Sequence, residues 1–132
     1  MVFVVADNIV GPLGSTTREN FNQVMRGNSG IGLQDHTSYG PAPFYGAMMT
    51  PAQLEEATTA VNVKGYTKFE KLLTASIHDA LQQTNISLAD PRTGLIISTT
   101  KGNIELLEQQ PEGVTPPLEQ LPPAATAEKI AT

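Results

Sequence analysis

The sequence predicts an α/β protein with a mixed or parallel sheet and packed helices. Three observations support this class: apolar runs at residues 2–5 and 94–100, and a strong helical pattern at residues 69–81. Both apolar runs are short and rich in β-branched residues, which is typical of strands buried on both faces. Each is followed by a turn and a helical pattern, an order typical of α/β folds. With 132 residues the chain is long enough for a single domain, predicted over 1–132.

The first strand is expected at residues 2–5, and the first helix begins after the glycine and proline breaker at 11–14. Thr16 and Glu19 have the spacing of a capping box, in which each side chain bonds the backbone N–H of the other residue. Gly27 supplies the left-handed backbone that ends such a helix. A helix is therefore predicted between Thr16 and Gly27.

Residues 30–49 mix glycine, proline and tyrosine without helical or strand periodicity, so an irregular but ordered segment is predicted there. Thr50 precedes a proline, and Gln53 occupies the third helical position. This pattern predicts a short helix through about Ala60, with a thin apolar face.

The strongest periodic signal follows a further possible capping box, formed by Thr67 and Glu70. Apolar and small residues recur there with the spacing of one helix face. The pattern predicts a long helix that faces the core. The residues of this face are Phe69, Leu72, Leu73, Ser76, Ile77, Ala80 and Leu81.

The second buried strand is expected at residues 94–100, followed by a turn and a short helix that holds Ile104 and Leu107. The five prolines between 111 and 123 predict an extended, linker-like stretch within the domain. A last helix is expected to start at residues 126–130. Because two turns of helix are too short to be stable unpacked, the fold is expected to be incomplete at its C-terminus.

Composition excludes several function classes. The chain has no cysteine, and its two histidines, His36 and His78, cannot make a zinc site, so neither a metal nor another cofactor is expected. A net charge of -5 argues against a nucleic-acid partner. No apolar run approaches the roughly 20 residues that span a bilayer, and no secretory signal is recognisable. A cytoplasmic protein is expected.

Three blocks of the sequence resemble the opening of the β-ketoacyl synthases, the condensing enzymes of fatty-acid and polyketide synthesis. The first runs from IVGPLG at residues 9–14 to MRGNSGI at 25–31. The second is the long helical pattern at 66–81, with Phe69 at a habitual aromatic position, and the third is TGLIISTTKGN at 93–103. Together the blocks cover roughly residues 2–108 in the family's order and spacing.

The resemblance implies the amino-terminal part of a thiolase-like fold, ahead of the nucleophilic cysteine and the two histidines of the family. The parent protein would be an acyltransferase, and this chain alone would have no catalytic residue. Its implied role is to supply scaffold, acyl-pocket and dimer surfaces, with assembly into a homo-oligomer. The alternative is a free-standing, non-catalytic α/β module that binds a carrier protein or another partner.

The resemblance also suggests a carrier-binding surface. Relatives dock the acidic acyl-carrier protein with basic residues near the start of the long helix, where this chain has Lys64, Lys68 and Lys71. The competing interpretation is an ordinary solvated helix face, since Glu70 lies among the lysines.

A second set of residues is predicted near the acyl pocket. By resemblance, Thr100 and Lys101 fall in the turn beside that pocket. Lys101 stands where relatives often have an apolar residue, which favours a specialised branch of the family over ordinary fatty-acyl specificity.

Overall fold

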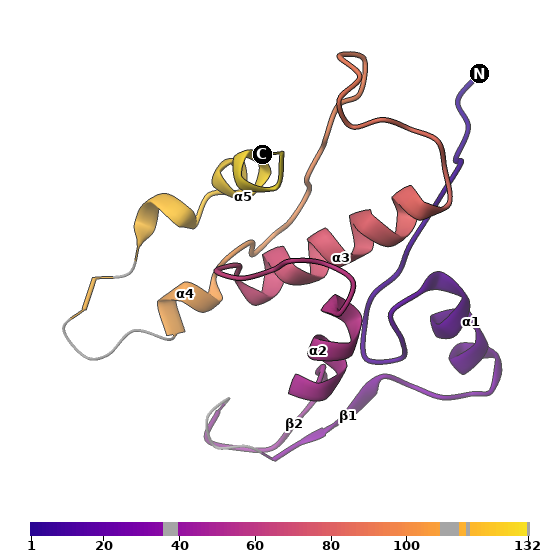
Figure 1. Cartoon of the computed structure of the whole chain (residues 1–132). Coiled ribbons are helices and arrows are strands. Elements are labelled where there is room, and N and C mark those ends of the chain that lie inside the picture. The colour runs from indigo at the N-terminus through magenta and orange to yellow at the C-terminus, as the bar shows by residue number, and fades with distance from the viewer. Residues whose placement is uncertain (36–39, 109–113, 116, 132) are drawn as a thin grey trace.

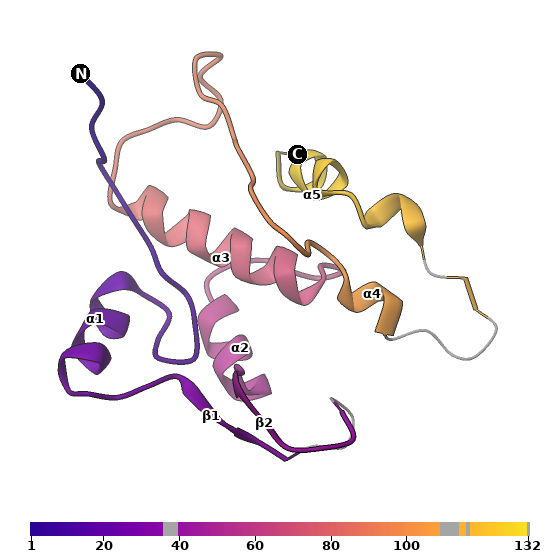
Figure 2. The ribbon, with the colours of Figure 1, turned by 180° about the vertical axis from the view of Figure 1, so that it is seen from behind.

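The computed structural model describes residues 1–35, 40–108, 114–115 and 117–131. Within these residues most of the regular structure is helical, and the sheet is one antiparallel hairpin (Figure 1). The long helix α3 lies at the centre of the arrangement, as the view from behind also shows (Figure 2). The elements are α1 (Thr17–Met25), β1 (Ile31–Gln34), β2 (Phe44–Ala47), α2 (Pro51–Thr58), α3 (Lys68–Gln82), α4 (Glu105–Glu108), a 3₁₀ turn (Leu118–Gln120) and α5 (Pro123–Ala131).

The predicted α/β class, with its mixed or parallel sheet, is wrong. Neither residues 2–5 nor residues 94–100 form a strand, and no parallel strand pair occurs in the described part of the chain. Val2 is 97% exposed and Ile96 is 93% exposed, so neither segment is buried. β-branched residues favour strands only where a neighbouring strand and a packed face are present, and here both are missing. The partial thiolase-like arrangement is therefore not found.

Capping boxes start three helices at the predicted positions. The Oγ1 atoms of Thr16, Thr50 and Thr67 each accept a hydrogen bond from the backbone N–H three residues later. The returning bonds, from the backbone N–H of each threonine to the side chain of Glu19, Gln53 and Glu70, are also present. These boxes satisfy N–H groups that a helix start leaves open. The predictions of α1, α2 and α3 are confirmed.

The hairpin was not predicted. Residues 31–34 and 44–47 pair in the register Ile31↔Ala47 and Leu33↔Tyr45, which places these apolar side chains on one face. Gln34 Nε2 donates to the Gly46 carbonyl oxygen at 3.2 Å and adds a cross-strand bond. Each strand has four residues and contains a glycine, so the periodicity is too weak to recognise from sequence.

The segment after α3 follows the prediction in part. α4 spans Glu105–Glu108 and includes Leu107, and α5 includes the expected 126–130. Part of the proline-rich stretch at 111–123 lies outside the described residues. Leu118–Gln120 forms a 3₁₀ turn and α5 already begins at Pro123, so the expectation of an extended or mobile stretch without helix is wrong at these positions. Proline fits there because the first helical residue needs no hydrogen-bonded N–H.

The apolar core is small. α2 packs against α3, and α3 against α5, yet Ala75, which is 7% exposed, is the one apolar residue that is buried among the described residues. The chain exposes 9817 Å² to solvent. A compact folded monomer of 14.1 kDa would expose about 6,700 Å². In the described chain, no helix has both the length and the apolar composition needed to cross a membrane.

Candidate functional site

The most buried polar side chains meet at the amino-terminal end of α3. This group, here called the Asn103 cluster, consists of Thr67, Glu70, Asn103, Thr126 and Lys129. Asn103 and Thr126 are fully buried, and Glu70 is 2% exposed. Asn103 Nδ2 lies 2.9 Å from Glu70 Oε1 and 3.1 Å from Thr126 Oγ1, while Thr67 Oγ1 donates to Asn103 Oδ1 at 2.6 Å. The cluster therefore joins α3, α5 and the turn before α4.

Lys129 neutralises the Glu70 carboxylate. Its Nζ lies 2.6 Å from Glu70 Oε2, donates to the Gly65 carbonyl oxygen at 2.9 Å, and stands 4.6 Å from the centre of the Tyr66 ring. Burial alone would raise the pKa of Glu70. The hydrogen bonds from Lys129, the Thr67 backbone N–H and Asn103 outweigh burial, and the net pKa is lowered.

The predicted carrier-binding lysines lie partly together. Lys68 and Lys71 line a cleft of about 510 Å³ at the start of α3, together with Tyr66 and Leu54. Lys64 is exposed and precedes this cleft in the chain without lining it. We call this surface, made by Lys64, Lys68 and Lys71, the lysine surface.

Two acidic residues near the lysine surface are already bonded. Glu70, which lies between Lys68 and Lys71 in the sequence, points into the Asn103 cluster and is held by Lys129. Glu105 also lines the cleft, but its carboxylate accepts a hydrogen bond from the Lys68 backbone N–H at the start of α3. Glu70 is thus withdrawn from the lysine surface, whereas Glu105 keeps its negative charge beside Lys68 and Lys71.

The predicted acyl-pocket turn is exposed. Thr100 and Lys101 are both exposed, and neither lines the lysine cleft. Thr99 Oγ1 accepts a hydrogen bond from the Gly102 backbone N–H at 2.9 Å, and Gly102 has a φ of 53°. This left-handed residue makes the turn that directs Asn103 into its cluster. The observed role of the turn is to position Asn103.

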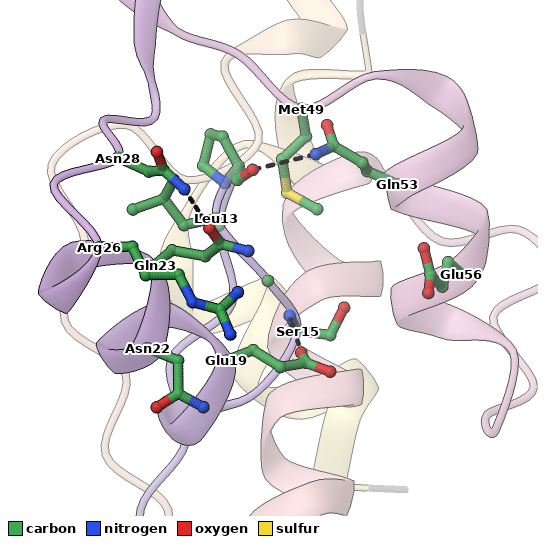
Figure 3. A pocket seen from close by; sticks show the side chains of 13 residues that line it. Leu13, Ser15, Glu19, Asn22, Gln23, Arg26, Asn28, Met49, Gln53 and Glu56 are labelled. Atoms are coloured by element: carbon green, nitrogen blue, oxygen red, sulfur yellow. Dashed lines mark hydrogen bonds between the residues drawn. The ribbon is translucent and has the colours of Figure 1, made fainter.

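A second cleft, of about 540 Å³, lies between α1 and α2 (Figure 3). We call it the α1–α2 cleft. Its lining is polar, and its charged residues are Glu19, Arg26 and Glu56. The remaining lining comes from the turn 11–15 and from Asn22, Gln23, Asn28, Met49 and Gln53.

Hydrogen bonds fix the walls of the α1–α2 cleft. Gln53 Nε2 donates to the Pro12 carbonyl oxygen at 3.0 Å and ties α2 to the turn before α1. Asn20 Nδ2 donates to the carbonyl oxygens of Ile9 and Gly14 and holds the turn closed. Gly14 has a φ of 156°, and a Cβ there would stand 2.5 Å from Glu19 Cβ. Only glycine fits this position.

Sequence reasoning missed both Asn103 and the α1–α2 cleft. The lowered Glu70 pKa and the buried position of Asn103 depend on residues from 23 to 59 positions away in the chain, and no local pattern reports them. Among the described residues, no three histidine, aspartate or glutamate side chains are grouped to hold a metal ion, and His36 lies outside those residues. No protein-family model matches the chain, and no curated protein or solved structure is significantly similar to it.

Proposed function

We propose that this chain is a non-catalytic, amino-terminal segment of a β-ketoacyl-acyl-carrier-protein synthase, which supplies scaffold, acyl-pocket and dimer surfaces and a docking surface for an acidic carrier. The observation that carries the proposal is the surplus of exposed surface. The chain exposes 9817 Å², about 3,000 Å² more than a compact monomer of its mass. This surplus on one chain exceeds the roughly 1,000–2,500 Å² that each partner buries in a large obligate interface.

The exposed apolar segments favour a role within a larger assembly. Val4 and Ile96 are 85% and 93% exposed, and their segments, 2–5 and 94–97, offer apolar side chains without a covering layer. Exposed apolar patches on soluble proteins usually mark contact surfaces. Such surface supports assembly with the remainder of a synthase or with a second copy, and it disfavours the alternative of a free-standing module.

The lysine surface supports the carrier part of the proposal. It holds three of the chain's eight basic residues within eight positions, on a chain of net charge -5. The Glu70 carboxylate is turned inward and paired with Lys129, so the three lysines outnumber Glu105, the acidic residue that lines the cleft with Lys68 and Lys71. Positive charge grouped in this way attracts an acidic partner and raises its association rate. A cytoplasmic location and the absence of a nucleic-acid partner belong to the same proposal.

The test is a titration of an acidic acyl-carrier protein into the full chain at low salt. We expect the variant Lys64→Glu/Lys68→Glu/Lys71→Glu to bind at least about tenfold more weakly, because close charge pairs across an interface become repulsive. A matched control, Arg18→Glu/Arg92→Glu/Lys101→Glu, changes the net charge equally at exposed positions elsewhere. Equal weakening of both variants, or of neither, would contradict docking at the lysine surface.

A second experiment separates the synthase from the rival module. The coding region beyond codon 132 is read, and the encoded protein is assayed for malonyl decarboxylation and condensation. A downstream cysteine and two histidines with measurable condensation support the synthase. Carrier binding without any condensing partner would support the module instead.

A further inference from the structure

The lining of the α1–α2 cleft includes one cation and one anion whose side chains have no hydrogen-bond or ion-pair partner in the described part of the chain. The Arg26 guanidinium lies on the α1 wall, and the Glu56 carboxylate lies across the cleft on the α2 wall (Figure 3). Neither side chain takes part in an ion pair or hydrogen bond with the described residues. A guanidinium and a carboxylate that line the same cleft without pairing with each other are suited to a ligand that has both a negative and a positive group.

Glu19 is the third charged residue of the lining and its second anion. Its Oε2 accepts hydrogen bonds from the backbone N–H groups of Ser15 at 2.8 Å and Thr16 at 3.1 Å. The first turn of a helix also stabilises a negative charge through the helix dipole. These bonds fix the Glu19 carboxylate at the start of α1 but leave its negative charge, so the lining carries one cation and two anions. Of the two anions, Glu56 is the one whose carboxylate has no hydrogen bond among the described residues.

The other lining side chains are mainly amides in fixed positions. Asn28 Nδ2 donates to Gln23 Oε1 at 2.5 Å, and Gln53 bonds both the Thr50 backbone N–H and the Pro12 carbonyl oxygen. Amides both donate and accept hydrogen bonds, so they suit a polar ligand group of the same kind. The volume of about 540 Å³ lies within the range of small-molecule sites.

We propose that the α1–α2 cleft binds a small zwitterion, an α-amino acid with a polar side chain. Its carboxylate pairs with the Arg26 guanidinium, whose planar fork matches a carboxylate, and its ammonium pairs with the Glu56 carboxylate. The amide lining takes the polar side chain. This site is independent of the carrier proposal, because none of the three surface lysines lines the cleft.

The probe is L-glutamine, titrated into the full chain by calorimetry and by amide chemical shifts of α1 and α2. We expect saturable binding with a dissociation constant of roughly 1 mM. Glutaramate lacks the ammonium group and 4-aminobutanamide lacks the carboxylate, and each is expected to bind at least about tenfold more weakly. Absence of saturable binding below roughly 10 mM, or equal binding of the three compounds, would overturn the proposal.

Matched variants locate the site. Arg26→Gln and Glu56→Gln are each expected to weaken L-glutamine binding at least about tenfold. Arg18→Gln on α1 and Glu55→Gln on α2 change exposed neighbours outside the lining and are expected to leave binding unchanged. Far-ultraviolet circular dichroism confirms that all four variants keep their helices. Equal losses in the controls would place binding elsewhere and refute the assignment.

Discussion

The Asn103 cluster and the two apolar segments at 2–5 and 94–97 differ in how much the rest of the chain contacts and covers them. In the cluster, Asn103 reaches groups from α3, the 3₁₀ turn and α5, and Glu70 is held by Lys129. The apolar segments are exposed, and no strand of the described residues lies beside them. The difference shows that buried polar contacts hold distant segments of this chain together, while the side chains of its two apolar segments are exposed to solvent. Substitutions in the cluster should therefore change mainly the stability of the chain, and substitutions in the apolar segments mainly its self-association.

The largest effect is expected at the centre of the cluster. Asn103→Ala removes the bonds to Thr67, Glu70 and Thr126 and leaves these groups buried without their partner. We expect the free energy of unfolding to fall by about 3 kcal/mol, measured by urea denaturation. Asn85→Ala, at an exposed position, is the control and should change it by less than about 0.5 kcal/mol. Equal effects would remove the distinction between the two regions.

The ion pair of the cluster should give the next effect. Lys129→Met leaves the Glu70 carboxylate buried without its cation and should cost about 2 kcal/mol at neutral pH. Because the pKa of Glu70 is lowered on folding, its contribution is complete above the ordinary glutamate range and is lost as the pH falls through the folded pKa.

The pH dependence provides a separate measurement of the same pair. Acidification from roughly pH 6 to pH 3 should destabilise the wild type more than Glu70→Gln, which has no proton to gain. Parallel pH profiles of the two proteins would show that Glu70 is not the responsible group.

The capping boxes allow one motif to be compared in two settings. Thr67→Ala removes both the cap of α3 and the hydrogen bond to Asn103, whereas Thr16→Ala removes only the cap of α1. We expect losses of about 2 kcal/mol and about 1 kcal/mol respectively, by urea denaturation. A larger loss for Thr16→Ala than for Thr67→Ala would mean that the hydrogen bond from Thr67 to Asn103 adds no stability beyond that of the helix cap.

The apolar segments should give the smallest effect on stability. Ile96→Lys is expected to change the free energy of unfolding by less than about 0.5 kcal/mol, because this side chain is 93% exposed. The same change should reduce self-association of the chain in light scattering, whereas Thr100→Lys, also exposed, should not. A strictly monomeric wild type would contradict the assembly part of the comparison.

Local signals explain which parts of the fold could be predicted. The capping boxes at Thr16, Thr50 and Thr67 depend on residues three positions apart, so sequence alone located the starts of α1, α2 and α3. The strands at 2–5 and 94–100 were predicted wrongly, because strand formation depends on a neighbouring strand that sequence does not specify. The hairpin was missed because its strands are short and contain Gly32 and Gly46.

Sequence alone grouped residues of the candidate sites only where those residues are close together in the chain. Lys68 and Lys71 share a helix face and line one cleft, as three-residue spacing indicates. Asn103 meets partners from distant segments, and Arg26 and Glu56 belong to different helices. Contacts between such distant segments depend on tertiary packing, which the spacing of residues in the sequence does not predict.

The long reach of Asn103 also determines when this part of the protein can form during synthesis. Asn103 bonds Glu70, 33 positions earlier, and Thr126, 23 positions later. Closing these loops costs chain entropy before any bond repays it, and a chain emerging from the ribosome cannot complete them until residue 126 is outside. Nascent chains that end before that residue should therefore leave the start of α3 open to proteases, while α1, capped within its own segment, forms first.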